Sequence, residues 1–382
     1  MKVLFIIPSI TNYHTFLKEL AQTLTDTGNQ VFLLAGEKAI VKGKSPYADP
    51  INCEWIKINF PRSFQPQKHL QSSLQIDAQI KKYKPDIIHI HFSAAMFTSA
   101  LARKKNWPIT IATVHGLAWP SRSKRSRILL KHAELNSAKK MDEVFVLNKE
   151  DLHSIKKNGV KNAALIPGKG IGCNIHDFDP EKINPEVRLK LQKELGLKSS
   201  DIVFIFIGRQ THFKGFHLVI KAFMRIYHSK SNYKLLLLGD KDRIHSSGLN
   251  STEEALIDII PSIIKISWKA NVADYLALAD INVFPSTREG LPVNLMESLS
   301  MGVPVITNDS RGCRDVVKDG FNGIVLKENI VNDIAEAMKQ LAENSVLRNK
   351  LSKNAFNQRE QFDRKNYIQY QVDYYQKLVK DQ

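Results

Sequence analysis

The sequence has no long apolar run and very few cysteines. No stretch approaches the eighteen or more apolar residues of a membrane-spanning helix, so we expect no helix to cross a membrane. The opening "MKVLFIIPSI" is too short for a secretory signal peptide and is expected to form a buried strand. The three cysteines are scattered, odd in number and without metal-ligand spacing, which predicts free thiols in a reducing cytoplasm.

Acidic residues are scarce in the first half of the chain. Residues 1–190 contain 29 lysines and arginines against 16 aspartates and glutamates, whereas residues 191–382 contain 26 against 22. The first half is therefore expected to face an anionic partner. The three candidates are a phosphorylated substrate, nucleic acid and an anionic membrane. The densest basic stretch, residues 119–140, predicts a surface helix near 122–131. Apolar residues beside its basic ones suit contact with phospholipid head groups, and a merely solvated basic helix fits the sequence equally well.

Short apolar runs alternate with longer segments of helical spacing. This alternation predicts parallel, doubly wound sheets. A charged, less apolar stretch at residues 174–201 divides the pattern in two. We therefore predict an α/β protein with two Rossmann-like domains that face a cleft, over residues 1–175 and 176–362, and a C-terminal helix over 363–382 that packs back on the first domain. The predicted strands are residues 2–10, 30–36, 86–93, 109–116, 143–148 and 163–168, then 202–208, 233–240, 263–268, 281–286, 303–307 and 322–326.

In such sheets ligands bind where the carboxyl ends of strands meet the N-termini of helices. The stretch "FIGRQTHFKGF" (206–216) ends a strand at Gly208, and Arg209 and Lys214 follow before the next helix. Both side chains are expected to reach a diphosphate, together with the positive end of the helix dipole. A solvated basic loop is the alternative interpretation. The Lys-Gly pair five residues after a strand-end arginine favours the phosphate site.

A second candidate is "STREGLPVNLMESLSMG" (286–302), with one carboxylate before a Gly-x-Pro break and another inside the following helix. Pro292 is expected in the first helical turn. The backbone N–H groups around Gly290–Val293 are then expected to point at the same ligand. Glu289 is placed to accept hydrogen bonds from sugar hydroxyls, and Glu297 to accept from a ribose. A glutamate that only complements the helix dipole is the alternative for Glu289.

Together, "GRQTHFKG" and the later E-x7-E pattern resemble the retaining glycosyltransferases of family 4, which have the two-domain GT-B fold. The likeness extends over nearly the whole chain and is strongest over 202–326. It implies an enzyme that binds a nucleotide-diphosphate sugar on its second domain and an acceptor on its first, with no metal and no cofactor. It also implies that basic side chains hold the diphosphate. The implied donor contacts are Gly208, Arg209, Lys214, Glu289, Gly290, Leu291, Pro292, Val293 and Glu297.

Two stretches of the first domain complete the candidate site. In "TVHGLAWP" (113–120), His115 follows a strand. A lone strand-end histidine is more often a structural hydrogen-bonding residue, but the resemblance implies that His115 contacts the donor sugar near the reacting centre. The loop "PSITNYHTF" (8–16) lacks the Gly-Gly pair of many relatives and resembles a subgroup that acts on polyprenol-diphosphate-linked sugars. His14 and Thr15 are therefore expected on the acceptor side. The alternative makes Tyr13 a core residue and His14 a polar residue at a helix start.

The resemblance implies transfer of a sugar, an N-acetylhexosamine from a UDP-sugar, to a lipid-linked saccharide in bacterial capsule, O-antigen or glycan synthesis. No carboxylate is identifiable as a nucleophile, so we expect retention through front-face substitution, with Arg209, Lys214, Glu289 and His115 as the catalytic residues. The enzyme is expected in the cytoplasm, peripherally bound to the inner face of the membrane. A nucleotide-sugar epimerase or hydrolase, or a transferase with a soluble acceptor, is the alternative.

Two other chemistries are not expected. The "HIH" stretch (89–91) lies on a predicted buried strand without a carboxylate cluster, so no metal site is predicted there. A nucleic-acid-binding protein would place stacking aromatic residues among its basic ones. Here the candidate motifs carry paired glutamates that would repel phosphates, and nucleic acid is not expected as a partner.

Overall fold

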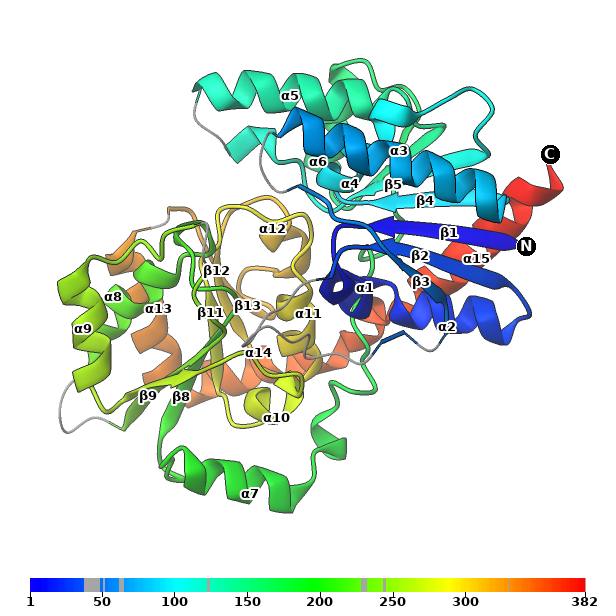
Figure 1. Ribbon diagram of the computed structural model, residues 1–382. Coiled ribbons are helices and arrows are strands. Elements are labelled where there is room, and N and C mark those ends of the chain that lie inside the picture. Colours follow the sequence, from blue (N-terminus) through cyan, green and yellow to red (C-terminus); the bar gives the residue numbers. More distant parts are fainter. Residues whose placement is uncertain are drawn as a thin grey trace. The chain divides into compact units, whose positions relative to one another are not determined.

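The computed structural model describes residues 1–37, 49–50, 52–61, 65–121, 124–227, 232–242, 245–328 and 330–381. The chain forms two compact units (Figure 1). The N-terminal unit comprises Met1–Ile171 and Lys365–Gln382, and the C-terminal unit comprises Gly172–Arg364.

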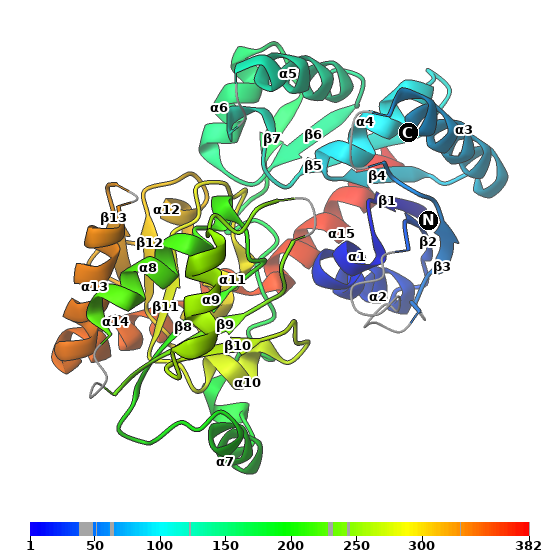
Figure 2. The ribbon, with the colours of Figure 1, turned by 60° about the vertical axis from the view of Figure 1, so that its left-hand side comes forward.

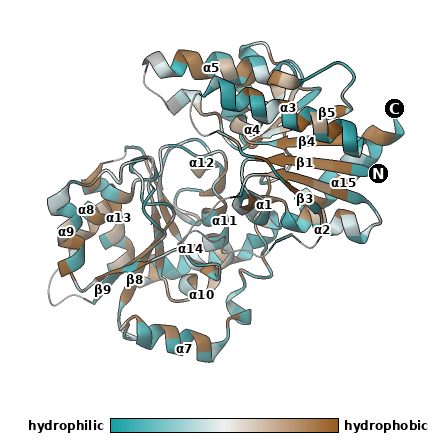
Figure 3. Cartoon of the chain, in the orientation of Figure 1, coloured by the Kyte–Doolittle hydropathy of each residue, from teal (hydrophilic) through white to brown (hydrophobic). Residues whose placement is uncertain are grey.

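The N-terminal unit contains a parallel sheet of seven strands in the order β3-β2-β1-β4-β5-β6-β7. The strands are β1 (Lys2–Ile7), β2 (Gln30–Ala35), β3 (Glu54–Lys57), β4 (Ile87–His91), β5 (Ile109–Val114), β6 (Glu143–Val146) and β7 (Ala163–Leu165). Figure 3 shows the apolar character of β1 and β4. Strands of this kind are apolar along their whole length because helices cover both faces of a parallel sheet.

Helices α3 to α6 cover one face of this sheet, and α1, α2 and α15 cover the other (Figures 1 and 2). The helices are α1 (Ile10–Phe16), α2 (Lys18–Asp26), α3 (Pro66–Tyr83), α4 (Ser93–Ala102), α5 (Lys124–Ala138), α6 (Lys149–Lys157) and α15 (Arg364–Lys380), with a short turn η1 (Trp119–Ser121). Apolar side chains of α3 to α6 form one core with the central strands. On the opposite face, Phe145 of β6 packs against Tyr370 and Tyr374 of α15. The prediction that the C-terminal helix packs on the first domain is thus confirmed.

Two local features of this unit differ from the sequence prediction. The helical spacing of residues 13–28 predicts one helix, but the segment forms two, because Leu17 interrupts the run between α1 and α2. Strand β3 was not predicted. It is a four-residue edge strand, and no residue in it is fully buried, so it lacks the continuous apolar run by which the other strands are recognised.

The C-terminal unit contains a second parallel sheet, in the order β10-β9-β8-β11-β12-β13. Its strands are β8 (Ile202–Ile207), β9 (Tyr233–Leu238), β10 (Ile263–Ile266), β11 (Ile281–Phe284), β12 (Val305–Asn308) and β13 (Gly323–Leu326). Between β8 and β11 the connections change direction across the sheet. In open parallel sheets such a switch point, at the carboxyl ends of the strands, is where ligands bind.

Helices α8, α9 and α13 cover one face of this sheet, and α10, α11 and α14 cover the other (Figures 1 and 2). The helices are α7 (Pro185–Glu194), α8 (Phe216–Ile226), α9 (Ser251–Ile259), α10 (Val272–Leu276), α11 (Val293–Ser300), α12 (Cys313–Val316), α13 (Val331–Glu343) and α14 (Ser345–Asn357), with short turns η2 (Pro180–Lys182), η3 (His212–Lys214) and η4 (Arg359–Phe362). The predicted fold class, two doubly wound parallel sheets, is confirmed.

Candidate active site

The loops that follow β8 and β11 are packed tightly against each other. A Cβ atom built on Gly215, whose φ is +75°, would lie 2.4 Å from the carbonyl oxygen of Pro285. One built on Gly312, whose φ is +78°, would lie 2.6 Å from the carbonyl oxygen of Gly290. Only glycine permits both the backbone conformation and the close approach at these two positions. The first contact packs the end of the first motif against the residue that precedes the second, at the switch point of the sheet, and the second contact packs the loop after β12 against the second motif.

Lys214 and Glu289 form an ion pair at this edge. Lys214 Nζ lies 2.6 Å from Glu289 Oε1, and the side chains are only 18% and 11% exposed. The Ser286 hydroxyl donates to the same carboxylate oxygen at 2.6 Å, and the Thr287 N–H donates to the Phe213 carbonyl at 2.9 Å. The sequence predicts separate ligand groups for Lys214 and Glu289. The structure shows the two side chains in contact, so a phosphate bound by Lys214 would share this lysine with Glu289.

Arg209 is the second predicted cation, and it is more exposed. Its guanidinium forms an ion pair with Asp242, which follows β9, and its side chain remains 53% exposed. It also lies over the ring of Phe213, 5.7 Å from the ring centre. The backbone N–H of His245 donates to Asp242 at 3.1 Å. Asp242 cannot be predicted as part of the site, because nothing near it in the sequence indicates that it meets Arg209.

Helix α11 begins at the same edge. Pro292 is its N-cap rather than a residue of its first turn, since its ψ of 110° is extended. That position has no side-chain cap, and the first turn of the helix carries no acidic residue. The first N–H groups of a helix have no partner within it, so the amide of Val293 is directed to this edge. The Asn294 side chain donates to the Ile207 carbonyl at 3.0 Å and ties the helix start to the end of β8, beside Gly208. Gly290 and Leu291 are buried in the turn that leads to the helix.

Glu297 lies one turn further along α11 and is partly buried. Burial raises the pKa of this carboxyl to about 7, and the charge of Arg364 opposes the shift. Arg364 is itself buried and donates to the Gly172 carbonyl at 3.3 Å. Near neutral pH the Glu297 carboxyl can therefore both accept and donate a hydrogen bond, which suits a pair of vicinal hydroxyl groups.

In the N-terminal unit, His115 follows β5 and lies among aromatic rings. Its ring is stacked on Phe92, with centres 3.8 Å apart and planes 8° apart. Phe16 of α1 meets it edge-on at 4.8 Å. His115 Nε2 lies 3.1 Å from His91 Nδ1 at the end of β4. Burial lowers the pKa of His115 to about 3, so the ring is neutral at physiological pH.

The two acceptor-side candidates lie on α1, the helix that also carries Phe16. The Thr15 hydroxyl donates to the Thr11 carbonyl at 2.9 Å within the helix. His14 is half-buried and meets the ring of Tyr13 edge-on at 5.3 Å. Tyr13 is fully buried, and its hydroxyl donates to Asn52 Oδ1 at 2.5 Å. The interpretation of Tyr13 as a core residue is thus confirmed, and His14 and Thr15 remain predictions.

The loop after His115 is held by two buried carboxylates that the sequence does not predict. Leu117 N–H donates to Asp151 Oδ2 at 3.2 Å. Ala118 N–H and Trp119 N–H each donate to Glu134 at 3.1 Å. Both acids are buried, and they lie on α6 and α5. Acidic residues on a predicted helix are ordinarily solvent-exposed, and nothing in the local pattern distinguishes these two.

The basic helix α5 exposes two neighbouring apolar side chains. Ile128 is 62% exposed and Leu129 is 54% exposed. The charged ends of Arg127 and Lys131 lie over the ring of Trp119, at 5.7 Å and 5.2 Å from its centre. Residues 122–123 of the predicted surface helix lie outside the described residues. Within the described part of the chain, no helix is both long enough and apolar enough to span a bilayer.

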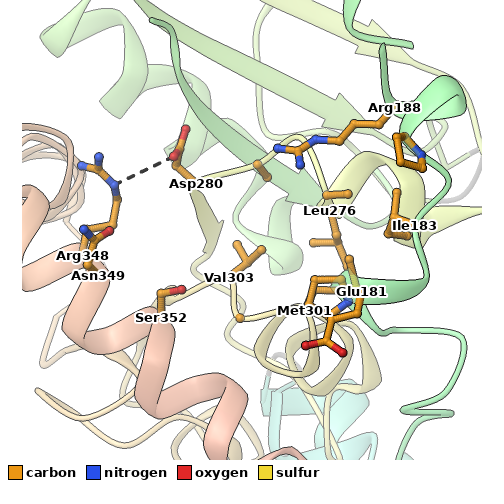
Figure 4. A pocket seen from close by; sticks show the side chains of 15 residues that line it. Glu181, Ile183, Arg188, Leu276, Asp280, Met301, Val303, Arg348, Asn349 and Ser352 are labelled. Carbon is orange, nitrogen blue, oxygen red and sulfur yellow. Dashed lines mark ion pairs between the residues drawn. The ribbon is translucent and has the colours of Figure 1, made fainter. Parts of the chain in front are cut away.

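A cavity of about 450 Å³ in the C-terminal unit lies away from these residues (Figure 4). It opens at the amino ends of the strands, where Asp280 precedes β11 and Val303 precedes β12. Arg348 Nε lies 3.9 Å from Asp280 Oδ1 across it. The cavity is thus at the opposite edge of the sheet from Lys214 and Glu289.

Comparisons with known proteins identify two matching families. Residues 14–168 match the family described as Glycosyltransferase Family 4, and residues 187–358 match the family described as Glycosyl transferases group 1. The chain is 27% identical over 296 residues to the UDP-Gal:alpha-D-GlcNAc-diphosphoundecaprenol alpha-1,3-galactosyltransferase of Escherichia coli, with 76% of this chain and 74% of the relative covered. It is 23% identical to the N,N'-diacetylbacillosaminyl-diphospho-undecaprenol alpha-1,3-N-acetylgalactosaminyltransferase of Campylobacter jejuni, with 100% of both chains covered.

Solved structures show the same fold. A sucrose-phosphate synthase from Thermosynechococcus elongatus superposes with a TM-score of 0.82 at 18% identity, with 100% of both chains covered. HepE of Anabaena, solved in complex with UDP-glucose, superposes with a TM-score of 0.79 at 17% identity, with 98% of both chains covered. These likenesses confirm the predicted GT-B fold.

Proposed function

The chain belongs to the glycosyltransferases of the group 1 and family 4 type, and we propose that it transfers a sugar from a UDP-sugar to a polyprenol-diphosphate-linked saccharide. The proposed donor sugar is an N-acetylhexosamine, and the product serves bacterial surface polysaccharide or glycan synthesis. Relatives named for undecaprenol-diphosphate acceptors and for capsular polysaccharide synthesis support this assignment.

The observation that carries the proposal is the Lys214–Glu289 pair beside the uncapped start of α11. A lysine, an arginine and a helix N-terminus at one sheet edge together form a site for a diphosphate. The Glu289 carboxylate within the same site supplies an acceptor for sugar hydroxyls. Glu297, further along the helix, is assigned to the ribose. This set of groups binds a nucleotide-diphosphate sugar without a metal ion, because the protein itself supplies the positive charge.

We assign a front-face mechanism that retains the configuration of the anomeric carbon. The acceptor hydroxyl attacks the anomeric carbon from the side that the diphosphate leaves. Its proton passes to the departing phosphate oxygen, and the carbon–oxygen bond to the diphosphate breaks. Lys214 and Arg209 stabilise the negative charge that develops on the diphosphate. Glu289 is held by Lys214 and Ser286, an arrangement that suits hydrogen bonding to the sugar rather than nucleophilic attack.

His115 is assigned to the donor sugar, and α1 with His14 and Thr15 to the acceptor. Each of these residues lies at the carboxyl edge of the N-terminal sheet. A neutral imidazole is a hydrogen-bonding partner for a hydroxyl group and does not compete for the diphosphate, because it carries no charge. We further propose that α5 attaches the enzyme to the inner face of the membrane, where its exposed Ile128 and Leu129 would lie among anionic head groups.

The test is a transfer assay with a panel of UDP-sugars. Each donor is incubated in EDTA with the full chain and an undecaprenyl-diphosphate-linked monosaccharide, and the product linkage is determined by NMR. We expect one donor to give an α-linked product from its α-configured UDP-sugar. Consumption of a UDP-sugar without an acceptor would favour the epimerase or hydrolase alternative. A strict requirement for a divalent metal, or an inverted product, would contradict the proposed mechanism.

A further inference from the structure

His91 is completely buried, and its ring has one hydrogen-bond partner among the described residues. Its Nδ1 lies 3.1 Å from His115 Nε2. Its other nitrogen, Nε2, is buried and has no hydrogen-bond partner among the described residues. The neighbouring His89 is different, because its Nδ1 lies against the Tyr375 hydroxyl and its Nε2 lies 2.8 Å from the Thr113 hydroxyl. Both ring nitrogens of His89 thus have hydrogen-bond partners of their own, and the His91–His115 hydrogen bond does not involve His89.

The shared hydrogen bond links the proton positions of the two rings. Burial lowers the pKa of both, so both are neutral, and one nitrogen of the contact donates while the other accepts. If His115 Nε2 carried the proton, His91 Nδ1 would accept it, and His91 Nε2 would then be a buried N–H without an acceptor. If His91 Nδ1 carries the proton, His91 Nε2 is only a buried acceptor without a donor. Orphaned buried N–H groups are rarer in proteins than under-used acceptors, which favours the second arrangement.

The orientation of the His115 ring is fixed as well. Phe92 stacks on it with the planes nearly parallel. Phe92 adopts a φ of +70° with a ψ of 146°, a backbone conformation that residues other than glycine rarely occupy. Such strain persists only where the surrounding structure enforces it, and it is concentrated at functional sites. The backbone between His91 and α4 is therefore held in an unfavourable conformation that places the Phe92 ring against His115.

We propose that His91 is a positioning residue that holds His115 as the tautomer protonated on Nδ1. His115 then presents an N–H donor, in a fixed plane, to a hydroxyl oxygen of the donor sugar. This inference rests on the proposed function for the identity of the ligand. The tautomer itself is a property of the free protein and does not depend on turnover. His91 acts on the substrate only through His115, in the way that an orienting group sets the tautomer of a histidine.

The tautomer can be measured directly. Long-range ¹H–¹⁵N NMR spectra of the full chain labelled with ¹⁵N-histidine distinguish a protonated ring nitrogen from an unprotonated one, and a His115→Asn spectrum assigns the signals. We expect His115 to carry its proton on Nδ1 and to bear none on Nε2. A proton on His115 Nε2 would overturn the proposal. Because this experiment needs no substrate, its failure is distinct from a failure of the transferase assignment, which the transfer assay reports separately.

Two variants test the consequence for catalysis. His91→Phe keeps an aromatic ring but removes the donor to His115, and we expect kcat to fall by about a hundredfold, as for the loss of one preorganised donor, while UDP affinity stays unchanged. His91→Asn retains an N–H close to the position of Nδ1 and should recover at least a tenth of the wild-type kcat. Equal kcat in His91→Phe and wild type would overturn the proposal. If His91→Phe does not fold, His91→Asn and the wild-type spectrum decide the question.

Discussion

At the carboxyl edge of the C-terminal sheet the candidate side chains are charged and paired, whereas at the same edge of the N-terminal sheet they are neutral and stacked. Lys214 and Glu289 face each other at 2.6 Å. His115 is held between Phe92 and Phe16, with a pKa well below neutrality because it is buried. The charged edge suits the diphosphate of a donor, and the neutral edge suits hydroxyl groups. In the proposed function, one fold that is used twice in the chain recognises two different parts of the substrates.

The largest effect is expected from removing the cation of the charged edge. Lys214→Ala should lower kcat by about a hundredfold or more, because it removes a preorganised charge from the departing diphosphate and leaves Glu289 unpaired. Initial rates of UDP release in the presence of acceptor measure this. Lys265→Ala is the matched control, since Lys265 pairs with Asp258 on the surface of the same unit. A wild-type rate in Lys214→Ala would show that Lys214 does not stabilise the departing diphosphate.

Near the neutral edge, the second effect is expected on stability, from removing the buried carboxylate of Glu134. Glu134→Ala leaves the N–H groups of Ala118 and Trp119 without their acceptor. At about 1–3 kcal/mol for each hydrogen bond lost to the buried carboxylate, the two donors give an expected loss of about 2–6 kcal/mol in the free energy of unfolding. Urea denaturation measures it. Glu134→Gln keeps one acceptor oxygen and should lose less. An unchanged midpoint in Glu134→Ala would show that the two carboxylate contacts do not hold this loop.

Glu297 belongs to the charged edge but titrates near neutrality. Its pKa in the folded protein is raised to about 7 by burial, against the opposing charge of Arg364, from an ordinary value of 4.5. A carboxyl group whose pKa is raised in the folded protein stabilises the fold fully at pH values below its pKa in the unfolded chain. That contribution is lost as the pH rises through the folded-state pKa of about 7. Relative to Glu297→Gln, the wild type should therefore lose at most about 3 kcal/mol between pH 5 and pH 8. Parallel stability curves for the two proteins over this range would contradict the shift.

The smallest effect is expected at the outer surface of α5. Replacing Ile128 and Leu129 together by serine should weaken sedimentation with vesicles that contain anionic phospholipid, by about tenfold, because the two exposed side chains lose their burial among the head groups. Val187→Ser, which changes an exposed apolar residue on α7, is the matched control. Unaltered vesicle binding in the double variant would place the membrane contact elsewhere or exclude it.

The two edges also differ in how much of them the sequence predicts. The alternating apolar runs predict both sheets, because a buried parallel strand is apolar along its whole length. Lys214 and Glu289 can be found from their motifs, since each lies directly after a strand or before a helix. Their contact cannot be found in this way, because it depends on Gly215 packing against Pro285.

Less of the neutral edge can be predicted from the sequence. Its motif contains His115, but the residues that fix this ring come from other strands and helices. Glu134 and Asp151, which hold the following loop, have the sequence pattern of ordinary surface residues of their helices. The exact helical position of Pro292 cannot be predicted from the sequence either. Its residue type suits both the first turn and the cap, and only its backbone angles place it at the cap.

The central claim is that side chains of the C-terminal unit, rather than a metal ion, hold the donor diphosphate. Calorimetric titration of UDP into the full chain in EDTA tests it most directly. We predict saturable binding to the wild type, at least tenfold weaker binding to Lys214→Ala, and weaker binding as salt is raised, because the contact is ionic. Binding that appears only after a divalent metal is added, or that is equally tight in Lys214→Ala, would contradict the claim.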